Sequence, residues 1–265
     1  MKKTLQIANG VALVSTIIVN YLSNTGLLNG RTIGDISDNI RSLFTPAGYT
    51  FAIWGIIYLM LFAFAIYQGR SLFVKVKNDD FVLKTGWWFV LSCMFNSSWV
   101  FAWLYGYTGL SCVFIFLLLL SLFKIVINNR MELDDVRFPV IAFVWWPFVI
   151  YSGWVTVASI ANVSSYLVKI NWDGFGLSPD VWTIIMIIIA SLINIYMVYK
   201  RNMREFAVVG AWALIGIGQA NANNHQTIMV LCYVCAVILL ITVAVHGFKN
   251  FSTNPFIKFQ QWRNE

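Results

Sequence analysis

Aromatic and asparagine side chains recur at helical spacing within apolar stretches of the chain. Phe51, Trp54 and Tyr58 stand at positions i, i+3 and i+7 of one stretch, and Asn96 and Trp99 are three residues apart in another. Residues at these spacings lie on one face of an α-helix. Indole and phenol rings stack on flat hydrophobic molecules, and an amide can hydrogen-bond a polar edge. The pattern therefore predicts non-covalent binding.

A third stretch carries the same combination of rings and amide. Trp154, Ala158 and Asn162 follow one another at four-residue intervals, on one helix face with Pro147 and Tyr151. The three faces lie far apart in the sequence, so a fold must bring them together before they can bind one molecule.

The elements that carry these faces are predicted to be membrane-spanning helices. Of the 265 residues, 59% are hydrophobic and 11% are charged, and the mean hydropathy is +0.73. Soluble domains have about 25% charged residues, so this chain has too little polar surface to dissolve. The predicted fold class is all-α, a polytopic transmembrane helix bundle.

Apolar runs long enough to cross a bilayer, about 17–25 residues, occur eight times. Barrel strands would instead be about ten residues long with alternating polarity. The seventh run is short and rich in glycine and alanine. The predicted spans are Leu5–Leu22, Pro46–Tyr67, Thr85–Tyr105, Gly109–Ile127, Phe138–Val163, Val181–Tyr199, Phe206–Ala220 and Ile228–Val245.

The basic residues predict the orientation of these helices. Fifteen of the 18 lysines and arginines fall on one side, and only Arg31, Arg41 and Lys169 fall on the other. Cytoplasmic loops carry the excess of positive charge, so both termini are expected in the cytoplasm, with the chain in the plasma (bacterial cytoplasmic) membrane. The net charge of +7 then anchors the protein rather than binding nucleic acid. A cleaved signal peptide is the alternative reading of the first run, and retention is favoured.

The two asparagines need partners if they lie inside a membrane. A polar side chain at this depth is costly unless it is paired, so Asn96 and Asn162 are expected to face the bundle interior. They are either interhelical hydrogen bonds worth about 0.6–2 kcal/mol each, or polar anchors in an aromatic cavity. Periodicity alone leaves both interpretations open.

Three segments resemble the TspO/MBR family of tryptophan-rich sensory or translocator proteins. Pro46-Ala-Gly48-Tyr49-Thr-Phe51-Ala-Ile-Trp54-Gly-Ile-Ile-Tyr58 resembles the signature of the family's second helix. Asn96-Ser-Ser-Trp99 is similar to its third-helix motif, and Trp154 to Asn162 to its fifth-helix motif. The chain departs from the family in three places: Phe51 and Trp54 are three rather than four residues apart, Tyr49 replaces a tryptophan, and Pro147 lies further from Trp154.

The resemblance implies a five-helix domain over residues 1–165 with a pocket that opens toward the loop between the first two helices. Three further helices, 166–248, and a short basic tail, 249–265, would follow. Family members bind porphyrins and other flat hydrophobic molecules. The expected ligand-binding residues are Phe51, Trp54, Tyr58, Asn96, Trp99, Trp154, Ala158 and Asn162.

The function expected from residues and resemblance together is a sensor or carrier for a planar hydrophobic molecule, such as a porphyrin, another tetrapyrrole or an isoprenoid. The expected partners are that ligand and membrane lipids, with a homodimer as a further possibility. No catalytic, metal-binding or cofactor-binding set is expected, because Cys232 and Cys235 lie in an apolar run and neither His225 nor His246 has a nearby ligand in sequence. A membrane enzyme for a lipophilic substrate and a transporter or permease subunit remain the alternatives.

The segment Ser23–Thr45 is longer than a simple connection between two helices. Connections beyond about 12–15 residues often act as lids over binding sites. Arg31 or Arg41 could meet an anionic group of a ligand, although solvation of both side chains is the favoured interpretation.

Overall fold

The computed structural model describes residues 1–76, 79–251 and 254–264, and these residues form helices and loops without a strand. A helix is present at each of the eight predicted spans. Lys77, one of the basic residues behind the orientation prediction, lies outside the described residues. The eight long helices are α1 (Lys2–Asn24), α3 (Ile53–Gly69), α5 (Trp88–Leu104), α6 (Thr108–Asn128), α8 (Trp146–Lys169), α9 (Pro179–Arg201), α10 (Arg204–Ala220) and α11 (Gln226–Lys249).

Six of the eight spans, within the described residues, are long and apolar enough to cross a membrane by themselves. The other two are α5 and α10, which have 17 residues each, at the lower limit of a spanning helix. The chain is therefore a multi-pass membrane protein built as a helical bundle.

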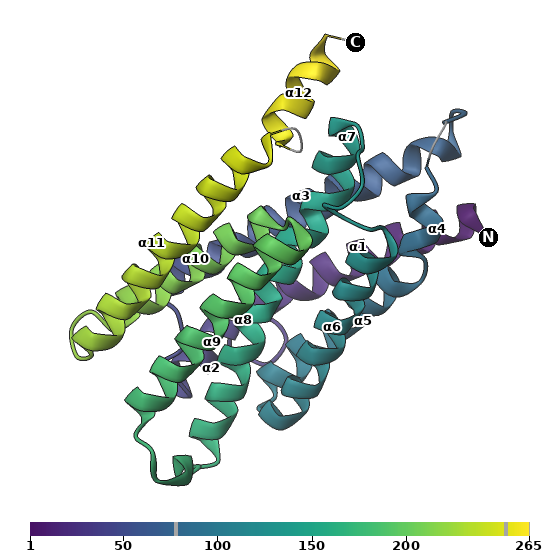
Figure 1. Ribbon diagram of the computed structural model, residues 1–265. Coiled ribbons are helices and arrows are strands. Elements are labelled where there is room, and N and C mark those ends of the chain that lie inside the picture. The colour runs from purple at the N-terminus through teal and green to yellow at the C-terminus, as the bar shows by residue number, and fades with distance from the viewer. Residues whose placement is uncertain (77–78, 252–253, 265) are drawn as a thin grey trace.

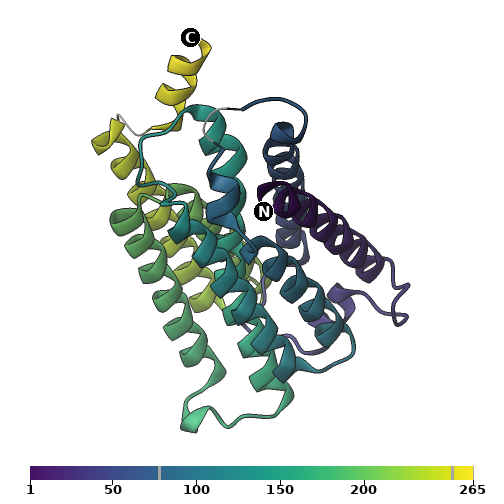
Figure 2. The same cartoon turned by 90° about the vertical axis from the view of Figure 1, so that its right-hand side faces the viewer.

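Five helices close into a ring. α1 packs on α3 and α5, α5 packs on α6, α6 packs on α8, and α8 returns to α3. Figures 1 and 2 show these helices running along a common direction, with α1 and α3 on one side of the molecule. The ring encloses the faces of α3, α5 and α8 that carry the predicted binding residues.

The remaining three long helices form a layer on the outside of the ring. α10 packs on α8, α9 and α11, and α9 packs on α11. In Figure 1 the layer lies on the side of α8 away from α1, and both termini lie at the same end of the bundle. α8 is thus shared between the ring and the layer.

The helix that contains α8 starts with a local distortion. A single turn, α7 (Phe138–Val140), and a π-helical segment, η3 (Ile141–Trp145), continue directly into α8. Pro147 lies in the first turn of α8, and proline lacks the N–H that would bond to the preceding turn. Widening of the helix just before a proline accommodates this loss.

The connection between α1 and α3 is ordered by two short helices. α2 (Ile33–Asn39) begins at a capping box, in which the Thr32 hydroxyl accepts from the Asp35 N–H and the Asp35 carboxylate accepts from the Thr32 N–H. The 3-10 helix η1 (Gly48–Ala52) then leads into α3. Other short elements are η2 (Arg70–Leu72), α4 (Phe81–Thr85), η4 (Gly174–Gly176) and α12 (Pro255–Arg263).

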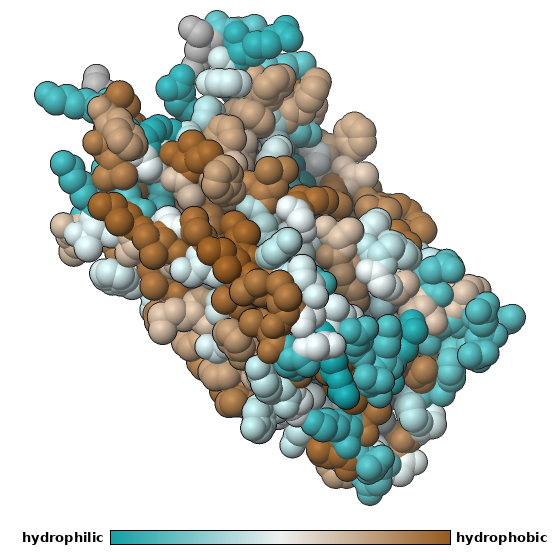
Figure 3. Space-filling model, turned by 180° about the vertical axis from the view of Figure 1, so that it is seen from behind, coloured by the Kyte–Doolittle hydropathy of each residue, from teal (hydrophilic) through white to brown (hydrophobic). Residues whose placement is uncertain are grey.

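The outer surface of the bundle is apolar along its length. Large hydrophobic side chains that point outward include Leu59 on α3, Phe116 on α6 and Ile241 on α11, each more than half exposed. Figure 3 shows hydrophobic residues across the middle of one face, with hydrophilic residues gathered toward the ends. Contiguous apolar surface of this kind marks contact with lipid or protein.

Candidate binding pocket

Trp54 lies at the centre of an aromatic cluster inside the ring. Its ring stacks on Tyr58 at a centroid distance of 5.7 Å and on Trp99 at 6.4 Å, with interplanar angles of 18° and 28°. Tyr151 and Trp154 meet it nearly at right angles, at 5.8 and 6.2 Å. Offset stacks and edge-to-face contacts at 4.5–7 Å are the favoured geometries of aromatic pairs. The fold thus brings together the aromatic faces of α3, α5 and α8.

Phe51 joins this cluster from η1. Its ring meets Trp154 edge to face at 5.8 Å. Phe51 belongs to a 3-10 turn and Trp54 to the α-helix that follows it. A 3-10 turn has three residues per turn, so the three-residue spacing still places both rings on the same side.

Asn96 connects three helices behind the rings. Its carbonyl oxygen accepts from the Asn20 amide of α1 at 2.7 Å, and its own amide donates to the Tyr151 hydroxyl of α8 at 2.8 Å. The side chain is fully buried. Both ends of the Asn96 amide are therefore used within the protein, and they hold α1, α5 and α8 in register.

Asn162 makes an equivalent connection near the other end of the face. Its carbonyl oxygen accepts from Trp99 Nε1 at 2.7 Å, and its amide donates to the Ser111 hydroxyl at 2.9 Å. The indole of Trp99 is thereby fixed in position against Trp54. Trp103 stacks on Trp99 at 6.0 Å and extends the row of rings.

Two adjoining cavities lie beside the aromatic cluster, and together we call them the aromatic pocket. The inner cavity is small, about 50 Å³, and is lined by residues of α3, α5 and α8 that include Trp54, Trp99, Trp154, Ala158 and Asn162. The outer cavity, about 460 Å³, lies under the segment between α1 and α3. Ile33, Ser37, Pro46, Phe51 and Trp54 line both.

The outer cavity has charged side chains in its wall, and the inner one has none. Arg41, Asp38 and Thr32 line it from the segment around α2, and Asn20 and Asn24 line it from the end of α1. The expected lid segment therefore contributes a wall of the pocket. Arg41 lies on this wall, whereas Arg31 is not among the lining residues.

The indole of Trp154 contains a donor without an acceptor. Trp154 is 1% exposed, and its Nε1–H has no hydrogen-bond partner among the described residues. A buried N–H left unpaired costs about 1–3 kcal/mol. Because Trp154 lines the inner cavity, a molecule that reaches this wall and carries an acceptor would remove that cost.

Seven of the eight predicted binding residues line at least one of the two cavities. The eighth, Asn96, lines neither cavity and hydrogen-bonds Tyr151 of α8. Sequence reasoning missed Asn20, which holds Asn96, and Ile33 and Ser37, which join the wall from α2. The signal for Asn20 was its place among apolar residues of the first span. The signal for α2 was the pair Thr32 and Asp35, three residues apart.

Charged side chains are also buried at the end of the bundle that holds both termini. Arg204 is 5% exposed in the first turn of α10, and Glu205 accepts from Trp146 Nε1 at 3.1 Å. Burial, and then the nearby charge of Glu205, raises the pKa of the Glu132 carboxyl well above its ordinary value. None of these residues lines the aromatic pocket.

Comparison with known proteins places the chain in a family. A model of the family described as TSPO-like protein matches residues 6–245. The match runs from α1 to α11, so it includes the three helices outside the ring. No curated protein and no solved structure matches the chain.

Proposed function

We propose that this chain, which belongs to the family of TSPO-like proteins, binds a flat hydrophobic small molecule in the aromatic pocket. A porphyrin, or another tetrapyrrole or isoprenoid of similar shape, is the ligand class that we propose, with the protein acting as a sensor or carrier. The two cavities together fall in the size range of about 300–1,000 Å³ that small-molecule sites occupy.

The unpaired indole N–H of Trp154 is the observation that carries this proposal. Structural side chains buried in a bundle normally have their donors satisfied, as Trp99 has through Asn162. Trp154 is packed among rings yet has no acceptor. A ligand that stacks near Trp54 and presents a carbonyl, carboxylate or ring nitrogen would accept from it.

The position of Arg41 favours a ligand with an anionic group at one edge. Arg41 lines the outer cavity together with Trp54, Tyr58 and Asp38. An extended molecule with its flat part against the rings would place its polar edge toward this arginine. Carboxylates are the groups that arginine binds most specifically.

The test is a titration of purified protein with protoporphyrin, followed by quenching of tryptophan fluorescence. Trp154→Phe keeps an aromatic ring but removes the N–H, and we expect roughly tenfold weaker binding. Asn162→Ala, which frees Trp99, should also weaken binding. Trp87→Phe, at a position that is 54% exposed, is the matched control for losing one indole.

A second arm separates the contribution of Arg41. Arg41→Gln should weaken binding of the dicarboxylate and leave binding of its dimethyl ester unchanged. If Trp154→Phe and Asn162→Ala both bind protoporphyrin as tightly as the unchanged protein, the aromatic pocket is not the binding site.

We also propose that the protein lies in the plasma membrane with both termini in the cytoplasm. The asymmetry of lysine and arginine supports this orientation, and reporter fusions at each terminus would test it. The division into a ring domain, 1–165, three further helices, 166–248, and a tail, 249–265, is part of the same proposal. A homodimer stays a prediction that sedimentation in detergent would check.

A further inference from the structure

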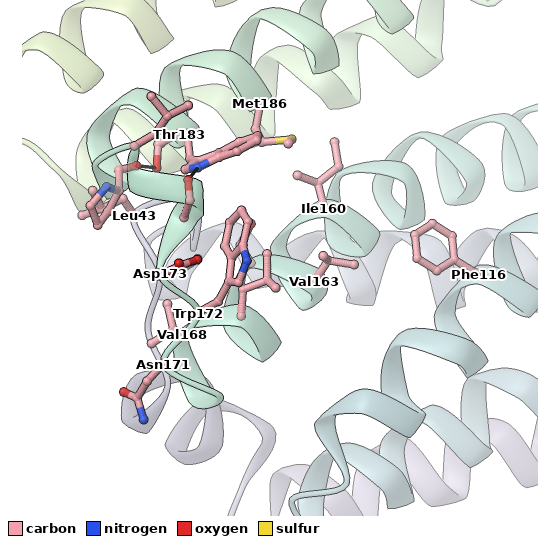
Figure 4. Close-up of a pocket in the computed structure, with 17 residues that line it drawn as sticks. Leu43, Phe116, Ile160, Val163, Val168, Asn171, Trp172, Asp173, Thr183 and Met186 are labelled. Atoms are coloured by element: carbon pink, nitrogen blue, oxygen red, sulfur yellow. Dashed lines mark hydrogen bonds between the residues drawn. The ribbon is translucent and has the colours of Figure 1, made fainter.

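A groove of about 550 Å³ lies outside the ring, between α8 and α9. Figure 4 shows Ile160 and Val163 along one side of it, Met186 and Thr183 on another, and Trp172 and Asp173 near one end. Phe116 of α6 and Leu43 add to its apolar lining. No Lys or Arg is among these lining residues, all of which belong to the described part of the chain.

The groove and the aromatic pocket are separate spaces on the two sides of α8. Ile160, Ser164 and Leu167 face the groove, whereas Ala158, Ala161 and Ser165 face the inner cavity. The groove also reaches the outer surface, because Phe116 is 51% and Val168 47% exposed. On a spanning bundle such a surface faces hydrocarbon, so the groove is accessible from the bilayer.

The groove is about as long as the hydrocarbon layer of one leaflet is thick. From Ile160 to the end of α8 at Lys169 the helix rises about 14 Å at 1.5 Å per residue. The hydrocarbon core of a bilayer is about 30 Å thick. An acyl chain of one leaflet therefore has room along the groove from the interface to the middle of the membrane.

Three aromatic side chains cluster at the end of the groove that we assign to the membrane surface. Trp172 lies 5.2 Å from Trp182 and 5.2 Å from Phe175 between ring centroids. Trp182 is held in place by a 2.8 Å hydrogen bond from Nε1 to the Gly174 carbonyl. Phe175 is 80% exposed at the tip of the loop. Tryptophan is enriched at the level of lipid headgroups.

The charge at this end is negative. Asp173 lines the groove and is exposed, and one of its oxygens accepts from the Phe175 N–H at 3.1 Å. The nearest lysine in sequence, Lys169, donates instead to the Gly106 carbonyl on the far side of α8. A carboxylate beside indole rings attracts an ammonium group by charge and by cation–π interaction and repels an anionic headgroup.

We propose that the groove binds one lipid of the surrounding bilayer that carries an ammonium headgroup, such as phosphatidylcholine. One acyl chain lies along Ile160, Val163 and Met186, and the ammonium lies near Asp173 and Trp172. This site is distinct from the aromatic pocket, because the side chains of α8 that line the two spaces are different.

Native mass spectrometry of the full chain tests the site. The delipidated protein is mixed with equal amounts of phosphatidylcholine and phosphatidylglycerol with identical acyl chains. We expect one phosphatidylcholine to be retained, with roughly three- to fivefold preference over phosphatidylglycerol. Asp173→Asn should abolish the preference, since the amide oxygen still accepts from Phe175 but carries no charge. Asp134→Asn, which removes a carboxylate paired with Arg130 elsewhere on the surface, should preserve it.

A second pair of variants tests the groove itself. Val163→Trp fills the groove and should lower retention of both lipids at least fivefold, whereas Val113→Trp, on an exposed face of α6 outside the groove, should not. Equal retention of the two lipids by the unchanged protein would overturn the proposal. So would unchanged retention in Val163→Trp, or a dimer mass that Val163→Trp removes, which would mean that a second copy of the chain occupies the groove.

Discussion

The ring and the layer of α9, α10 and α11 are both packed helices, but they pack with different side chains. In the ring, large aromatic residues and buried amides meet across α3, α5 and α8 and leave two cavities between them. In the layer, glycines of α10 allow close contact. A Cβ on Gly210 would collide with the Asn194 side chain, and one on Gly218 would lie 3.1 Å from Cys232. Large aromatic side chains keep the helices of the ring far enough apart to leave space for a ligand. Small residues let the helices of the layer approach closely, so no such space remains at these contacts.

The layer also contacts the ring at one point that matters for the aromatic pocket. Gly216 of α10 lies directly against Thr50 of η1, and its carbonyl accepts from the Ala47 N–H at 3.0 Å. Trp212 Nε1 donates to the Thr50 carbonyl at 3.1 Å. η1 carries Phe51, so the layer positions one wall of the aromatic pocket.

The largest effect is expected from Gly216→Ala. The new methyl group would collide with the Thr50 side chain, and overpacking of this kind costs about 1–3 kcal/mol. We expect a lower unfolding temperature in detergent and weaker protoporphyrin binding. Gly10→Ala, where an added Cβ meets nothing within 4 Å, is the control. Equal behaviour of the two variants would show that the layer does not position η1.

Asn96→Ala is expected to have an effect of comparable size, because it removes two hydrogen bonds between helices of the ring. Each such bond is worth about 0.6–2 kcal/mol in a membrane. Asn194→Ala in the layer removes only a bond to its own helix, to the Ala190 carbonyl, and should cost much less. Thermal unfolding of both variants compares the two regions directly, and an equal loss would remove the distinction between them.

Trp212→Phe should have a smaller effect on stability but a measurable one on binding. It removes the hydrogen bond to Thr50, worth about 0.5–1.5 kcal/mol, although Trp212 does not line either cavity. We expect protoporphyrin affinity to fall a few fold. Trp182→Phe loses the equivalent bond to Gly174, away from the aromatic pocket, and should bind as well as the unchanged protein.

The smallest effect is expected at the edge of the ring, where Lys2 of α1 pairs with Asp79 before α4. Burial alone would raise the pKa of Asp79, but hydrogen bonds from Lys2 and Ser71 and the charge of Lys2 hold it below its ordinary value. A lowered carboxyl pKa stabilises the fold above a pH of about 4 and ceases to do so as the pH falls. Asp79→Asn should therefore cost up to about 1 kcal/mol at pH 7 and progressively less as the pH falls below about 4, measured by thermal unfolding.

Much of the fold was predictable because a membrane allows few kinds of spanning structure. Lipid forces long apolar helices, and each of the eight predicted spans is a helix. The positions of α2 and α12 were missed, although Thr32 with Asp35 and Asn254 with Pro255 are helix-start signals. Both helices are short and polar, so hydropathy does not reveal them.

The sequence predicted the separate helix faces that line the aromatic pocket, but not how these faces come together. Helical spacing placed Phe51, Trp54 and Tyr58 together, but no local rule pairs Asn20 with Asn96, which are 76 residues apart. The contact of Gly216 with Thr50 joins residues even further apart in sequence. His225 likewise meets Asp180 at 2.7 Å, a partner that sequence reasoning did not find. Long-range pairs depend on how helices are arranged, and periodicity does not encode that arrangement.

α8 has a different space on each of its two faces. A molecule that shifts this helix from one side changes the shape of the space on the other. Thermodynamic reciprocity then requires the two occupants to alter each other's affinity by the same factor, in the same direction. If both proposed sites are occupied, the lipid composition of the membrane would therefore change the affinity of the aromatic pocket for its ligand.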